Sequence, residues 1–71
     1  MEEDLNAAIK TLNAQGYTVR PFLRQGTLRF EIDGSMFATR QEMLELTAGV
    51  YSVDELRELL VRRRAEEQSR L

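Results

Sequence analysis

The sequence predicts an α+β fold in which one helix is followed by a two- or three-stranded antiparallel sheet and then by two short helices. Three observations predict this order: an apolar stripe of helical period near the N-terminus, strict alternation in the middle, and two helix-capping sequences after it. The chain has 71 residues, so we expect a single small domain over 1–71.

Residues 2–15 are predicted to form the first helix. Its apolar stripe, at the spacing i, i+3, i+4 and i+7, consists of Leu5, Ala8, Ile9 and Leu12. The acidic residues at positions 2–4 suit the positive end of a helix dipole. Gly16 is typical of the left-handed residue that follows a helix, so the helix should end just before it.

The middle of the chain predicts a β-hairpin. Residues 27–32 alternate strictly between polar and apolar side chains, as in a strand with one buried face. The preceding segment, 17–24, is rich in strand-forming residues, and Gln25-Gly26 is a suitable two-residue loop. Pro21 lacks a backbone N–H, so we expect the first strand at an edge of the sheet.

The register of this hairpin predicts which side chains face the core. A two-residue loop at 25–26 places on the buried face Tyr17, Val19, Pro21, Leu23, Leu28, Phe30 and Ile32. A second turn is expected at Asp33-Gly34, because both residues tolerate the positive φ of a type I′ turn. Residues 35–38 would then form a short third strand.

Two capping boxes of the form S/T-x-x-E mark the starts of the last two helices. They occupy residues 39–42 and 52–55. We expect one helix at about 40–48 and another at about 53–64. The apolar period then fails, so residues 62–71 are predicted to be a solvated helical extension or a frayed or disordered end.

The composition argues against an enzyme. The chain has no histidine and no cysteine, which removes the commonest general base and the usual imidazole and thiolate ligands of zinc. No phosphate-binding glycine loop, dinucleotide fingerprint or zinc-protease motif is present. We therefore expect no catalytic residues, no metal and no cofactor.

The termini and the hydropathy favour a cytoplasmic protein. Residues 1–4 are acidic where a secretory signal would be basic, and no apolar run approaches the roughly 20 residues of a membrane span. The lack of cysteine also fits an intracellular protein. Together with the small size, these features suggest a protein of bacterial or phage type that does not associate with membranes.

The outer face of the hairpin is the first candidate binding site. The same register brings together Arg20, Phe22, Arg24 and Arg29 on the face opposite the core. Arginine supplies charge and forked donors, and phenylalanine supplies an exposed ring, which suits an acidic protein or a single-stranded nucleic acid. The alternative is that Phe22 is an ordinary exposed or helix-covered residue among solubilising arginines.

A second basic cluster consists of Arg62, Arg63 and Arg64. It could contact phosphates or an acidic protein surface. The alternative is a solvated helix end, in which cations interact with the helix dipole and with glutamates one turn away, in the pairs Glu58–Arg62 and Glu66–Arg70.

The two C-terminal helices could also form a helix-turn-helix. The second of them, however, begins with Asp54 and Glu55 and continues with Glu58. These carboxylates would face phosphates, so the sequence argues against reading DNA through this helix.

These patterns predict a small protein-interaction module, such as an adaptor, an inhibitor or a regulatory subunit, whose partner is another protein with an acidic surface. Self-association is also expected to be favourable, because a small core gains from extra apolar burial. The alternative is a nucleic-acid-binding protein that uses the arginine-bearing hairpin face or the basic end of the last helix. The net charge of -2 makes nucleic-acid binding the weaker of these two hypotheses. A third hypothesis is a stability or assembly role without a discrete site.

Overall fold

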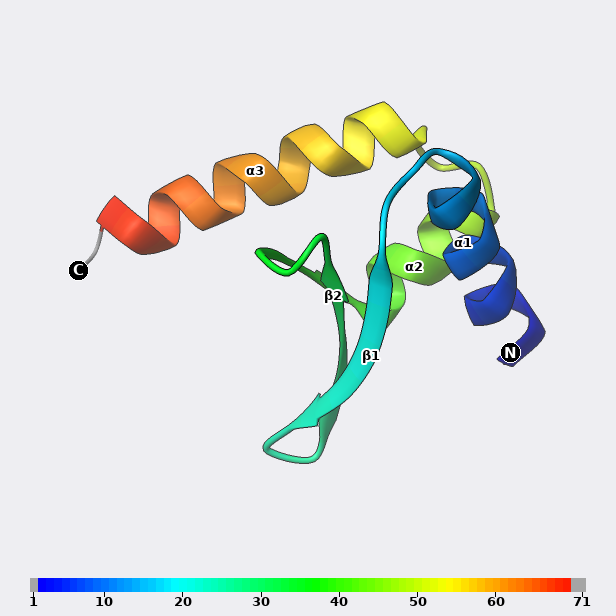
Figure 1. Cartoon of the computed structure of the whole chain (residues 1–71), viewed down its shortest axis with the longest axis horizontal. Coiled ribbons are helices and arrows are strands. Elements are labelled where there is room, and N and C mark those ends of the chain that lie inside the picture. The colour runs from blue at the N-terminus through cyan, green and yellow to red at the C-terminus, as the bar shows by residue number, and fades with distance from the viewer. Residues whose placement is uncertain (1, 70–71) are drawn as a thin grey trace.

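The computed structural model describes residues 2–69. In chain order its elements are α1 (Glu2–Ala14), β1 (Val19–Arg24), β2 (Thr27–Ile32), β3 (Met36–Thr39), α2 (Arg40–Thr47) and α3 (Val53–Ser69). The strands form one antiparallel sheet in the order β1-β2-β3, so the predicted α+β fold is confirmed. The β1–β2 hairpin projects away from the helices, and the C-terminal half of α3 extends in another direction (Figure 1).

The first hairpin has the predicted register. Arg24 pairs with Thr27 across the loop, and the pairing continues residue by residue along both strands. The loop residues have positive φ, 53° at Gln25 and 78° at Gly26, as a two-residue type I′ loop requires. The outward arginines of the two strands therefore share one face.

The turn between β2 and β3 differs from the prediction by one residue. Asp33 and Gly34 have positive φ as expected, and the Ser35 N–H donates to the Ile32 carbonyl at 3.3 Å. However, Ile32 pairs with Met36, so the loop contains residues 33–35 and the third strand does not begin at Ser35.

This extra loop residue decides which side chains of β3 face the core. Met36 and Ala38 are buried, whereas Phe37 is 40% exposed on the opposite face of the sheet. Ala38 pairs with Phe30, so a small side chain lies beside the largest one in the core. This combination lets the helices approach the sheet closely.

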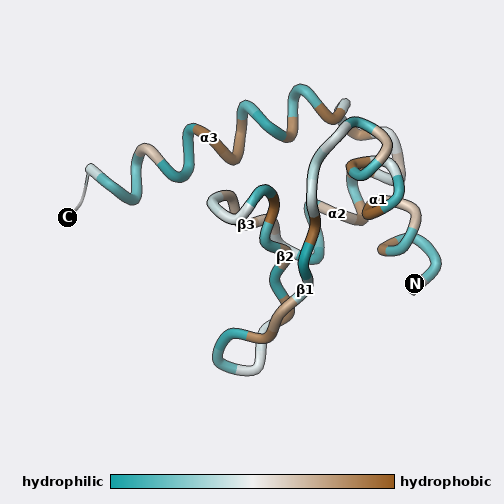
Figure 2. The backbone as a smooth tube through the Cα atoms, viewed as in Figure 1, coloured by the Kyte–Doolittle hydropathy of each residue, from teal (hydrophilic) through white to brown (hydrophobic). Residues whose placement is uncertain are grey.

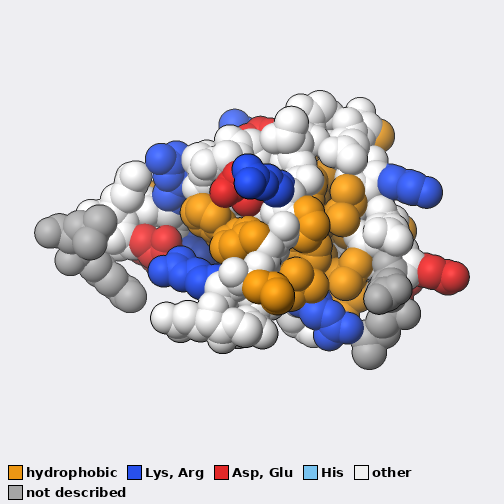
Figure 3. Space-filling model, turned by 60° about the horizontal axis from the view of Figure 1, so that its bottom comes forward, with side chains coloured by type: hydrophobic (Ala, Val, Ile, Leu, Met, Phe, Trp, Pro, Cys, Tyr) orange, Lys and Arg blue, Asp and Glu red, His pale blue; other side chains and the backbone are white. Residues whose placement is uncertain are grey.

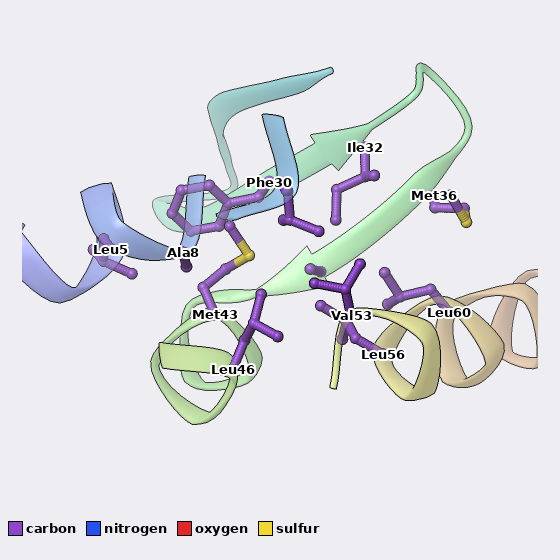
Figure 4. Close-up of a cluster of buried hydrophobic side chains, with 12 residues drawn as sticks. Leu5, Ala8, Phe30, Ile32, Met36, Met43, Leu46, Val53, Leu56 and Leu60 are labelled. Atoms are coloured by element: carbon purple, nitrogen blue, oxygen red, sulfur yellow. The ribbon is translucent and has the colours of Figure 1, made fainter. Parts of the chain in front are cut away.

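The core lies between one face of the sheet and the helices. Phe30 of β2 and Met43 of α2 point toward each other near its centre (Figure 4). The predicted stripe of α1 faces this core, with Ile9 only partly buried. The buried hydrophobic residues are Leu5, Ala8, Leu12, Phe30, Ile32, Met36, Ala38, Met43, Leu46, Val53, Leu56 and Leu60.

The outer half of the hairpin extends past the helices, which corrects part of the predicted core. Leu23 lies on the core side of the sheet by register but is 72% exposed, and Pro21 is exposed as well. The loop at 25–26 is remote from α1 and α2 (Figure 1), so no helix covers these two side chains. Alternation predicts a face of the strand correctly, but not whether anything packs on it.

Both predicted capping boxes are present. The Thr39 hydroxyl accepts a hydrogen bond from the Glu42 N–H at 3.1 Å, and the Glu42 carboxylate accepts one from the Thr39 N–H at 2.8 Å. Ser52 and Glu55 make the same reciprocal pair at 3.2 and 2.9 Å. The helices α2 and α3 therefore begin where the sequence predicts.

The last helix continues beyond its last buried residue. Leu60 is the final core residue of α3, yet the helix continues to Ser69. This outer part is mostly hydrophilic (Figure 2) and consists largely of good helix formers. Of the segment 62–71, the last two residues, Arg70 and Leu71, lie outside the described residues, and so does the expected Glu66–Arg70 pair.

The caps give a first prediction. Thr39→Ala and Ser52→Ala should each lower the free energy of unfolding by about 1 kcal/mol, because each leaves a helix N–H without its side-chain acceptor. Chemical denaturation followed by circular dichroism measures both. The matched control is Thr11→Ala within α1, where alanine favours the helix and no loss is expected. Unchanged midpoints for both cap variants would contradict the capping interpretation.

The hairpin gives a second prediction. Phe30→Ala should destabilise the protein by about 3–5 kcal/mol, because it removes a large, fully buried side chain. Leu23→Ala on the same side of the sheet should change the stability by less than about 0.5 kcal/mol, since that side chain is exposed. The same denaturation measurement compares them. A core-sized loss for Leu23→Ala would mean that the outer hairpin is covered in solution.

Candidate functional site

A groove of about 430 Å³ lies between the outer face of the sheet and the C-terminal half of α3. Its floor consists of outward side chains from all three strands, and its wall consists of Arg63 and Glu67 of α3. With the bottom of Figure 1 turned toward the viewer, hydrophobic side chains gather near the middle of the molecule, with basic and some acidic side chains around them (Figure 3). The predicted hairpin site thus lies in a concave surface.

The predicted residues of the hairpin share its outer face. Phe22, Arg24 and Arg29 line the groove. Arg20 follows the same parity but lies outside the groove, opposite Glu31 in the neighbouring strand. Within residues 2–69, neither the Arg24 nor the Arg29 side chain makes a hydrogen bond or an ion pair, so both guanidinium groups remain available to a ligand.

Phe37 is a groove residue that the sequence analysis missed. Its ring packs edge-to-face on the half-buried ring of Phe22, with centroids 5.7 Å apart and planes at 72°. Such a pair is favourable beyond its buried area, and here it sits among cationic side chains. One sequence signal could have placed Phe37 on the outer face. Residues two apart in a strand point to the same side, and Phe37 is two residues from the polar Thr39.

The wall of the groove is held in place by Arg63. Its guanidinium donates to the Phe37 carbonyl at 3.1 Å and binds both carboxylate oxygens of Glu42. Glu42 is only 8% exposed, and the same carboxylate caps the start of α2. Arg63 therefore joins α3 to β3 and to α2 at one point.

This pairing separates Arg63 from its two neighbours in the second predicted site. Arg62 and Arg64 are exposed, but Arg63 is bound to Glu42 and partly buried. Consecutive residues of a helix point about 100° apart, so the three side chains do not share one surface. Arg63 is part of the groove wall, whereas Arg62 and Arg64 do not line the groove.

The charge states of this network are fixed by its surroundings. Burial raises the pKa of Glu42, but hydrogen bonds from Arg63 and from the Thr39 N–H, with the positive charge of Arg63, hold this pKa below its ordinary value of 4.5. The Tyr51 hydroxyl donates to the Glu42 carbonyl at 2.8 Å. Burial and the nearby charges of Glu45 and Glu42 raise the pKa of Tyr51 to about 12. At neutral pH Glu42 is therefore ionised and Tyr51 is neutral.

Two hydroxyls, those of Thr27 and Thr39, line the groove. The Thr39 hydroxyl, one of the two hydroxyls that line it, accepts the capping hydrogen bond from α2. Within residues 2–69 there is no cluster of three or more His, Cys, Asp or Glu residues that could hold a metal ion. The same part of the chain contains no helix long and apolar enough to cross a membrane.

The network gives a third prediction. Glu42→Gln should lower the free energy of unfolding at neutral pH by about 1–3 kcal/mol, because the charge-assisted bonds to Arg63 are lost. Since the pKa of Glu42 is lowered on folding, its contribution is complete above its ordinary value of 4.5 and disappears as the pH falls through the lower folded value.

Denaturant unfolding at pH values from neutral to strongly acidic measures this effect. The wild-type protein should lose stability more steeply than Glu42→Gln as the pH falls below 4.5. Glu58→Gln, which removes an exposed carboxylate from α3, is the control and should stay within about 0.5 kcal/mol of wild type at neutral pH. Parallel acid profiles for wild type and Glu42→Gln would contradict the assignment.

Comparison with protein-family models, with curated proteins and with solved structures gives no match. What this chain does must therefore be inferred from the groove itself.

Proposed function

We propose that this chain is a small, non-enzymatic protein-interaction module that binds an acidic surface of another protein through the outer face of its hairpin. It acts in the cytoplasm, as an adaptor, inhibitor or regulatory subunit of bacterial or phage type. One observation carries this proposal: an aromatic pair, half-buried Phe22 and exposed Phe37, is flanked by Arg24 and Arg29, whose side chains have no partner within residues 2–69.

The residue types on this face support binding to protein. Arginine and aromatic side chains are enriched among the residues that contribute most to the affinity of protein interfaces. The chain as a whole carries a net charge of -2, so a locally basic face contrasts with the rest of the surface. An acidic partner would meet a complementary potential here, which favours both association rate and orientation.

Binding of single-stranded nucleic acid is the second candidate, because arginines and aromatic rings on an open sheet can hold phosphates and bases. The geometry of the two rings makes nucleic acid the weaker candidate. The planes of Phe22 and Phe37 lie at 72°, so they do not provide successive parallel platforms for stacked bases.

The proposal gives a fourth prediction. Phe22→Ala combined with Arg29→Glu should abolish capture of a stoichiometric protein partner from the native cell, because it removes the aromatic anchor and reverses a central charge. Affinity capture followed by mass spectrometry measures the loss, and circular dichroism should show an intact fold.

The matched control is Val61→Ala combined with Arg62→Glu. It makes comparable apolar and charge changes at exposed positions of α3 that do not line the groove, so it should retain the partner. Retention of the partner by the Phe22 and Arg29 variant would contradict the proposal, and so would its unfolding, which would make Phe22 structural. A captured species destroyed by nuclease would favour the nucleic-acid candidate instead.

A further inference from the structure

We infer that the groove receives one short, acidic segment of the partner polypeptide, with a single apolar or aromatic side chain seated on Phe37. This inference rests on the proposed function and adds the form of the partner. It excludes a broad, flat protein surface as the main contact.

The shape of the site supports a short segment. A groove of about 430 Å³ is within the range of roughly 300–1,000 Å³ that encloses a ligand or a few side chains. An ordinary flat interface buries about 800 Å² per partner and needs an open surface of that size. Here Arg63 and Glu67, one helical turn apart, form a wall along the sheet, so a flat surface cannot reach the groove floor.

The wall is a fixed part of the molecule. Arg63 is held by the Phe37 carbonyl and by both carboxylate oxygens of Glu42. The side chain of Phe37 is 40% exposed and lines the same groove as Arg63. The distance between wall and floor is therefore set before any partner binds, which lowers the ordering cost for a bound segment.

The charges of the groove select an acidic segment. Arg63 is neutralised by Glu42, whereas Arg24 and Arg29 have no counter-charge bound to them within residues 2–69. Both lie on the strands, while Glu67 lies on the wall. Carboxylates of the segment therefore face the sheet, and its apolar side chain lies on Phe37 between the two surfaces.

Fluorescence anisotropy with the full chain tests this inference. The probe is a short fluorescein-labelled peptide of aspartate and glutamate residues around one central phenylalanine. It should bind, and replacing that phenylalanine with alanine should weaken binding by about tenfold or more. A peptide with lysines in place of the acidic residues, and a short single-stranded RNA, serve as comparison probes and should bind much more weakly.

Two matched pairs of variants locate the segment. Glu67→Gln should strengthen binding of the acidic peptide by about threefold, because it removes a like charge from the wall, whereas Glu66→Gln, which lies outside the groove, should not. Arg24→Ala should weaken binding by about tenfold, whereas Arg62→Ala should not. Equal effects within each pair would overturn the placement of the segment.

The other outcomes separate the two proposals. If no acidic peptide binds but the Phe22 and Arg29 variant still loses its cellular partner, the partner docks in another form and only this inference fails. If the RNA binds more tightly than the acidic peptide, and Arg24→Ala weakens that binding, both this inference and the proposed function fail.

Discussion

The ion pair between Glu42 and Arg63 ties the outer part of the last helix to the rest of the molecule. The Glu42 carboxylate caps α2 through Thr39 and binds Arg63, which also donates to the Phe37 carbonyl on β3. One carboxylate thus joins a helix start, a strand and the last helix. Partly buried ion pairs contribute little net stability, because desolvation offsets much of their attraction. The main effect of the Glu42–Arg63 pair is to fix the line along which α3 passes the sheet.

That line decides which surfaces of the sheet remain open. The sheet order leaves β1 and β3 at the edges, and α3 packs against β3. The other edge contains Pro21, whose missing N–H weakens any pairing with a further strand. With both edges restricted and the inner face largely covered by helices, the outer face and its groove are where we place the proposed partner.

Local patterns were enough to predict most of the fold and the arginines of the site. The capping boxes, the apolar stripe and the two-residue loop each depend on neighbouring residues, so the helix starts and the positions of Arg24 and Arg29 follow from the sequence. The pairing of Arg63 with Glu42 could not be predicted from the sequence, because the two residues are far apart along the chain and meet only through tertiary packing. Likewise, the alternation that assigned Leu23 to the inner face carries no information on how far the helices extend.

Because Ser35 belongs to the loop, it determines which side chains of β3 face the core and which face the groove. If the loop contained only residues 33 and 34, Ile32 would pair with Ser35. Phe37 would then point into the core and Ala38 would point outward. The core would then have to accommodate a ring where the helices now approach a methyl group, and Phe22 would lose the ring on which it packs. Close packing of the helices and the aromatic floor of the groove are therefore two consequences of the same loop length, and selection for either one would preserve the other.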